Sequence, residues 1–195
     1  FKDMVEAIQS AIGRKVDLVH CANSGAVLGH EPGWLDMVRP GIMIYGFYPD
    51  PGTPRSIPLK PGLSFLTRVS FVKKVPAGTS IGYGRTWFAP EDTWIATIPA
   101  GYADGLNRLF SNCGRALVNG RSCPVVGRVC MDQSMLNLGP ETDVQVGDTV
   151  VLIGRSGDEE ITCDEWAEKL HTITYEVTCQ INARVARVYD PYTGS

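Results

Sequence analysis

The sequence predicts two parts of different fold class: the last elements of a β/α fold over residues 1–46 and a mainly β domain over residues 61–195. Helix, strand, turn and strand patterns follow one another within the first 45 residues, as they do in a repeating β/α fold. From residue 61 onwards, strands and tight turns dominate the pattern. The stretch between the two parts is rich in proline, and we interpret residues 47–60 as a linker.

In the first part, residues 3–12 repeat apolar side chains every three to four positions, which predicts an amphipathic helix. Residues 16–20 and 36–45 are short apolar runs that predict strands, the second interrupted by Arg39-Pro40-Gly41. Two or three elements of a β/α fold leave apolar faces uncovered. We therefore expect the rest of this fold to lie on polypeptide upstream of the sequence.

In the second part, residues 63–75 alternate in polarity, which predicts a strand with Phe65 on its apolar face. Residues 116–126 predict a hairpin, because Asn119-Gly120 is a favoured pair for a type I′ turn. Thr162 and Glu165 have the spacing of a capping box, which predicts a helix that ends near Leu170. Further strands are predicted at residues 94–99, 149–153 and 184–189.

The composition, with 44% hydrophobic and 20% charged residues, is typical of a globular protein. A net charge of −3 without a run of Lys or Arg disfavours nucleic acid as a partner. The six cysteines and three histidines show no C-x-x-C pair and no metal-ligand spacing, so we predict no metal site and a reducing compartment, the cytoplasm. No apolar run approaches the ~18 residues of a membrane span.

Two polar turns follow predicted strands in the first part: Asn23-Ser24-Gly25 and Arg39-Pro40-Gly41-Ile42. At the carboxyl ends of β/α strands, backbone N–H groups and hydroxyls commonly hold a phosphate. Short turns with Gly and Ser are also common in every fold class. The pattern alone therefore leaves a phosphate site and a pair of ordinary turns both open.

Tyr83 and Tyr102 lie in the glycine-rich segments GYG and GYADG. Glycine leaves room for a substrate to approach closely, and a tyrosine there can act as an acid or a base. Met131 lies in the mixed segment Arg128–Gln133, which follows a predicted strand. Each of these residues can equally be a partly buried side chain at a turn or a strand end.

Six motifs follow one another over almost the whole chain. They are ANSG (22–25), DMVRPGI-x-x-YG (36–46), GYGRTW (82–87), PAGYADG (99–105), VVGRVCMDQ (125–133) and TITYEV (172–177). Together they closely resemble the motifs of alanine racemases. Each motif is weak by itself, but six of them in the family's order are specific.

The resemblance implies an N-terminal (β/α)8 barrel that holds pyridoxal 5′-phosphate, and a mainly β, barrel-like C-terminal domain. Residues 1–46 would be the last part of that barrel, and residues 61–195 the β domain. It also implies a homodimer in which the β domain of one subunit completes the active site of the other.

The resemblance also implies roles for single residues. Tyr83 matches one of two catalytic bases, and Arg39 matches the arginine that faces the pyridine nitrogen of the cofactor. Tyr102 and Met131 match residues that line the substrate site of the partner subunit, where the Met131 backbone N–H would contact the substrate carboxylate. The residues that match the phosphate-binding positions are Ser24, Gly41, Ile42 and Tyr175, with Asn23 beside them.

The second base of the family is a lysine that also binds the cofactor covalently. None of the six lysines in this sequence matches its motif, so we expect the chain by itself to be inactive. The parent protein is expected to interconvert L- and D-alanine and to supply D-alanine for peptidoglycan. Two alternatives stay open: a serine racemase domain, because a small apolar pocket only weakly rejects an extra hydroxyl, and a non-catalytic β module that dimerises.

Overall fold

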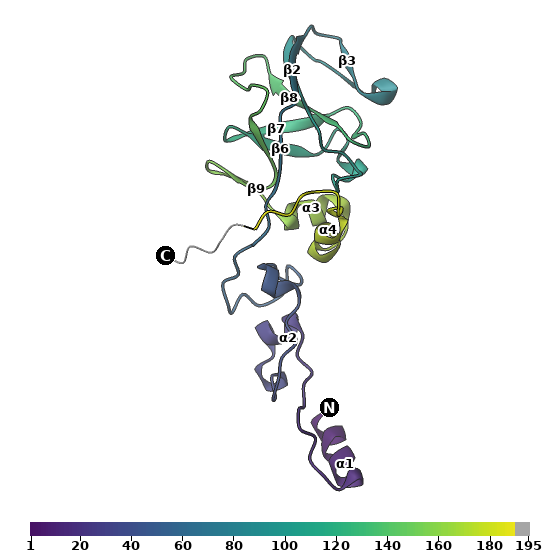
Figure 1. The fold of residues 1–195 in the computed structure, drawn as a ribbon, viewed down its shortest axis with the longest axis vertical. Coiled ribbons are helices and arrows are strands. Elements are labelled where there is room, and N and C mark those ends of the chain that lie inside the picture. Colours follow the sequence, from purple (N-terminus) through teal and green to yellow (C-terminus); the bar gives the residue numbers. More distant parts are fainter. Residues whose placement is uncertain (190–195) are drawn as a thin grey trace. The chain divides into compact units, whose positions relative to one another are not determined.

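The computed structural model describes residues 1–189 and divides into two compact units, residues 1–62 and residues 63 onwards (Figure 1). The first unit contains helices α1 (Lys2–Ile12) and α2 (Ser24–Gly29) and two short 3₁₀ helices, η1 (Glu31–Gly33) and η2 (Ile42–Tyr45). Within residues 1–189, no helix has the length and apolar character needed to cross a membrane.

The predicted helix is confirmed as α1, whereas the two strands predicted in the first unit are wrong. The only pairing between residues 16–20 and 36–45 is a parallel bridge of His20 with Met37, and residues 42–45 form η2. Parallel sheets occur almost only where helices cover both faces. Residues 1–62 form no such layered sheet, and the apolar side chains of α1 stay uncovered, with Ile8 46% and Ile12 50% exposed.

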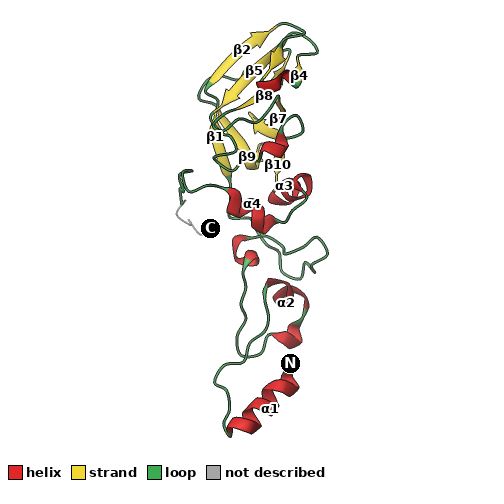
Figure 2. Cartoon of the chain, turned by 90° about the vertical axis from the view of Figure 1, so that its right-hand side faces the viewer, coloured by secondary structure: helices red, strands yellow, loops and turns green. Residues whose placement is uncertain are grey.

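The second unit is built on one antiparallel sheet whose strands follow the order β1-β9-β6-β7-β8-β5-β2, with β10 paired to β9. Figure 2 shows that the strands lie in this unit, together with helices α3 and α4. The strands of the sheet are β1 (Phe65–Arg68), β2 (Phe71–Val75), β5 (Thr93–Ile98), β6 (Arg115–Val118), β7 (Arg121–Val126), β8 (Ser134–Gly139), β9 (Thr149–Ser156) and β10 (Glu159–Ile161).

The remaining elements of this unit are short. They are the paired strands β3 (Ser80–Ile81) and β4 (Trp87–Phe88), the 3₁₀ helices η3 (Tyr83–Arg85) and η4 (Arg108–Phe110), and the helices α3 (Cys163–Leu170) and α4 (Thr174–Gln180). The mainly β fold class predicted for this part of the chain is confirmed.

Local turn chemistry sets the β6–β7 hairpin. Asn119 and Gly120 have φ values of 48° and 73°, the left-handed conformations that a type I′ turn requires. Val118 therefore pairs with Arg121, as the sequence predicts, and the three residues that precede the turn are fully buried.

The strand predicted over residues 63–75 is interrupted. β1 pairs with β9 and β2 pairs with β5, so the chain changes partners between Arg68 and Phe71. At the change, the Val69 N–H donates to the Asp148 carbonyl and the Ser70 N–H donates to the Thr97 carbonyl. The predicted alternation holds as far as Val69, which is buried, and fails at Phe71, which is 54% exposed.

The strand predicted at residues 184–189 is also wrong. These residues form turns and irregular backbone, because the Arg187 guanidinium donates to the carbonyls of Ile181, Asn182 and Val185 at 2.7 to 2.8 Å. A backbone whose carbonyls converge on one guanidinium is held in a turn and cannot extend as a strand. Val188 and Tyr189 then lie in the open, 84% and 86% exposed.

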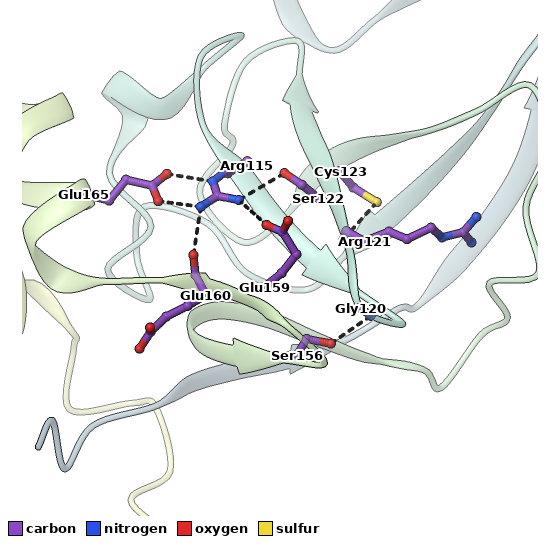
Figure 3. A network of polar contacts seen from close by, with 9 residues as sticks. All are labelled: Arg115, Gly120, Arg121, Ser122, Cys123, Ser156, Glu159, Glu160 and Glu165. Carbon is purple, nitrogen blue, oxygen red and sulfur yellow. Dashed lines mark hydrogen bonds and ion pairs between the residues drawn. The ribbon is translucent and has the colours of Figure 1, made fainter.

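Helix α3 begins as predicted: the Thr162 side chain accepts the Glu165 N–H at 3.0 Å. The Glu165 carboxylate, however, does not accept the Thr162 N–H as it would in a capping box. It binds the Arg115 guanidinium instead, through two hydrogen bonds of 2.8 and 2.7 Å. Arg115 also donates to Glu159 and to the carbonyl of Glu160 (Figure 3). This network fastens α3 and β10 to β6, and thus one end of the sheet to the helix that covers it.

Candidate active site

A groove of about 580 Å³ in the second unit collects side chains from three loops. It is lined by residues 128–133 together with Tyr83, Tyr102 and Arg108. Three of the predicted site residues, Tyr83, Tyr102 and Met131, therefore line the same groove.

The Tyr83 loop is held against the segment that follows β7. Gly82 has a φ of 75°, and a Cβ there would lie 3.1 Å from the backbone nitrogen of Arg128. Both the left-handed backbone and the close contact favour glycine at this position. Asn112 links the two segments, because its amide donates to Thr86 Oγ1 at 3.1 Å and its oxygen accepts the Gly127 N–H at 2.7 Å. The Tyr83 side chain itself is 75% exposed.

Tyr102 and Met131 lie on two segments joined by backbone hydrogen bonds. The Tyr102 N–H donates to the Cys130 carbonyl and the Ala103 N–H to the Met131 carbonyl, both at 3.0 Å. A Cβ on Gly101 would lie 2.2 Å from the Cys130 carbonyl oxygen, so only glycine permits this approach. The Met131 N–H has no hydrogen-bond partner within residues 1–189 and is available to an acceptor.

Arg108 and Arg128 also line this groove, and pattern reasoning did not assign either of them a role. Two guanidiniums beside exposed tyrosines suit a negatively charged group such as a carboxylate. The sequence signal for Arg128 was present, since it lies in the quoted motif VVGRVCMDQ. Arg108 begins η4 and belongs to no motif quoted above, so no sequence signal pointed to it.

In the first unit, the two polar turns meet. The buried Ser24 hydroxyl oxygen accepts the N–H of Gly41 at 2.7 Å and that of Met43 at 3.4 Å. Asn23 caps α2 by accepting the Ala26 N–H at 3.1 Å, and Ile42 is buried beside them. The structure thus brings together four of the residues predicted to hold a phosphate.

Arg39 is fixed on the same unit by the segment that precedes α2. Its guanidinium donates to the Nδ1 atom of His20 and to the Cys21 carbonyl, and its backbone N–H donates to the Ala22 carbonyl. Pattern reasoning did not include His20. The signal was weak, because a single histidine at the end of an apolar run carries no motif of its own.

Tyr175, the remaining predicted phosphate-binding residue, lies on α4 of the second unit and is 37% exposed. It is not among the residues that line the groove. The predicted site residues therefore form two groups: five on the first unit, and four on the second, of which three share the groove.

Asp104 anchors the Tyr102 segment, and the pKa of its carboxyl is shifted by its surroundings. Burial of its carboxyl acts to raise the pKa, but hydrogen bonds from Arg184 and from the Gly101 N–H outweigh burial and lower the pKa below its ordinary value of 3.8. The folded state therefore favours the ionised form of this side chain.

A lowered pKa makes stability depend on pH in a defined direction. The contribution of Asp104 is complete above its unfolded-state pKa and is lost as the pH falls through the folded-state value. Asp104→Asn should therefore lower the melting temperature at neutral pH, and the difference from the wild type should shrink below about pH 4. Thermal unfolding from about pH 7 to pH 3 measures this, and a difference that stays constant with pH would contradict it.

Two protein-family models match the chain. The family model of the alanine racemase C-terminal domain matches residues 63–189, and that of the N-terminal domain matches residues 1–49. The chain belongs to the alanine racemase family.

Among alanine racemase relatives, the protein of Cutibacterium acnes is 56% identical over 172 residues, which cover 88% of this chain and 46% of the relative. Alanine racemase 2 of Caldanaerobacter subterraneus is 47% identical over 97% of this chain and 48% of the relative. The chain thus spans about half the length of the curated alanine racemases it matches.

Solved alanine racemase structures have the same fold. The enzyme of Bacillus anthracis with bound L-Ala-P superposes with a TM-score of 0.88 at 38% identity, over 98% of this chain and 50% of that one. The alanine racemase of the D-cycloserine producer Streptomyces lavendulae gives the same TM-score and identity over 97% of this chain and 50% of that one.

Proposed function

We propose that this chain is the C-terminal half of a cytoplasmic alanine racemase. The enzyme interconverts L- and D-alanine and supplies D-alanine for peptidoglycan. The observation that carries the proposal is the groove, in which the exposed phenol of Tyr83 lies with Tyr102 and Met131. These are the positions at which the family's motifs imply a catalytic base and substrate contacts.

The residues of the first unit fit the phosphate of pyridoxal 5′-phosphate. Backbone N–H groups of the Gly41 turn converge on the buried Ser24 hydroxyl, whose hydrogen has no acceptor within residues 1–189. A hydroxyl whose hydrogen is free in this way can donate to a phosphate oxygen. Asn23, Ser24, Gly41 and Ile42 would hold the phosphate, and Arg39, fixed by His20, would face the ring nitrogen. When bound, this cofactor supplies a sink for the electrons of the substrate's Cα–H bond.

The residues of this chain then transfer one proton and orient the substrate. Racemisation removes a proton from one face of Cα and returns a proton to the other face, so two bases on opposite sides are required. Tyr83 holds and moves the proton on one face. The Met131 N–H, free within residues 1–189, and the guanidiniums of Arg108 and Arg128 orient the substrate carboxylate. The second base is a lysine that this sequence does not contain.

We further propose a homodimer in which this groove faces the cofactor held by the other subunit. Tyr83, Tyr102 and Met131 are 75%, 44% and 53% exposed, so their side chains are open to contact with a second subunit. Exposed aromatic and Met side chains on one wall are typical of surfaces that are covered in an assembly.

An assay of the full-length protein with pyridoxal 5′-phosphate tests the function. We expect reactions started from L-alanine and from D-alanine to reach the same mixture of the two enantiomers. We expect L-serine to be converted more slowly. Chiral chromatography of both amino acids over time measures this. Faster conversion of serine would favour a serine racemase, and no conversion of either amino acid would favour a non-catalytic module.

A further inference from the structure

The Arg184 guanidinium joins two loops of the groove. Its Nε donates to Asp104 Oδ1 at 2.7 Å, and its Nη2 donates to Asp132 Oδ1 at 2.6 Å. Asp104 lies two residues after Tyr102, and Asp132 directly follows Met131. A single side chain from the C-terminal segment is therefore bonded to both segments that carry the proposed substrate contacts.

Asp104 transmits this contact to the Tyr102 backbone. Its second carboxylate oxygen accepts the Gly101 N–H at 2.8 Å, and its carbonyl accepts the Asn182 N–H at 3.2 Å. The Asp104 side chain is only 15% exposed, whereas that of Asp132 is 58% exposed. The Asp104 contact is thus the better shielded of the two, since water screens a pair less as it becomes more buried.

The C-terminal segment is itself held in place. Arg187 donates to the carbonyls of Ile181, Asn182 and Val185, and the Val185 N–H donates to the Asn182 carbonyl at 3.1 Å. These bonds form the turn that presents Arg184 to the two carboxylates. The turn takes the place of the strand that the sequence pattern predicts there.

We propose that Arg184 is a positioning residue for the racemase reaction: by pairing with Asp104 and Asp132, it sets the separation of Tyr102 and Met131 on the groove wall. The inference rests on the proposed function. A guanidinium has a planar fork that binds two carboxylates in fixed directions, which a lysine ammonium does not. Arg184 is 46% exposed, so water partly screens its pairs, and we expect their main effect on the two segments that they join.

Kinetics of variants in the full-length protein test the proposal. Arg184→Met should raise KM for L-alanine about tenfold and lower kcat by less than about threefold, because a small misplacement of substrate contacts weakens binding and orientation. Arg184→Lys should recover part of the loss, since an ammonium pairs with one carboxylate at a time. The matched control is Arg155→Met, which removes an arginine–carboxylate pair with Glu160 at 2.8 Å outside the groove, and its KM should equal that of the wild type.

Hydrogen exchange gives a second readout that does not depend on activity. The Tyr102 and Ala103 amides, which donate to the Cys130 and Met131 carbonyls, should exchange about tenfold faster in Arg184→Met and at the wild-type rate in Arg155→Met. A lower melting temperature with unchanged KM and unchanged exchange at these amides would overturn the proposal. If the wild type racemises neither alanine nor serine, the proposed function fails, while the exchange rates still decide whether Arg184 fixes the two loops.

Discussion

Tyr83→Phe should lower kcat for alanine racemisation about 10³-fold in the full-length protein, because a positioned general acid or base contributes roughly 10² to 10⁴. The change removes one oxygen and keeps the ring, so the shape of the groove is preserved. Tyr83 is 75% exposed, and its hydroxyl has no hydrogen-bond partner within residues 1–189. Its loss should therefore leave the folded structure and the melting temperature unchanged.

If two bases act on opposite faces of Cα, Tyr83→Phe should also separate α-hydrogen exchange from inversion. With the phenol absent, the remaining base still serves one face of Cα. One enantiomer of alanine should then exchange its α-hydrogen for solvent deuterium faster than it inverts, whereas the other should do neither. Proton NMR in D₂O measures exchange and chiral chromatography measures inversion.

The control for this experiment is Tyr189→Phe, the same substitution at an 86% exposed tyrosine that does not line the groove. Its kcat should equal that of the wild type. Full racemisation by Tyr83→Phe, or equal loss in both variants, would show that the proton on that face is carried by another group.

Trp166→Ala should lower the free energy of unfolding of the β domain by about 3 to 5 kcal/mol, as expected for truncation of a buried aromatic side chain. Trp166 is 2% exposed, and its ring centroid lies 4.6 Å from that of Phe110 and 6.2 Å from that of Phe65. It therefore joins α3 to η4 and to β1, and an alanine there would leave a cavity beside both rings.

The loss should also reach the groove. Phe110 ends η4, whose first residue, Arg108, lines the groove. Urea unfolding followed by circular dichroism measures the stability. Val146→Ala, a truncation at a side chain that is 63% exposed, is the control and should change the free energy of unfolding by less than about 0.5 kcal/mol. Equal effects of the two truncations would contradict the assigned packing.

Elements whose geometry is set by neighbouring residues were predicted correctly. The Asn119-Gly120 turn, the Thr162 cap of α3 and the amphipathic helix α1 all depend on contacts within a few positions of the chain. Elements that need distant partners were not. Residues 16–20 and 36–45 have the composition of strands, but in a unit without further strands they form only a bridge.

The sequence by itself identified the candidate site residues and the family that the chain resembles, because both depend on side-chain type and on order along the chain. Only the tertiary structure decided which of those residues meet. Tyr83, Tyr102 and Met131 share a groove, and Arg184 binds carboxylates 80 and 52 residues before it. The pairing of β5, β7 and β8 positions these loops, and a sheet order of that kind is fixed by contacts between distant residues, which local patterns do not encode.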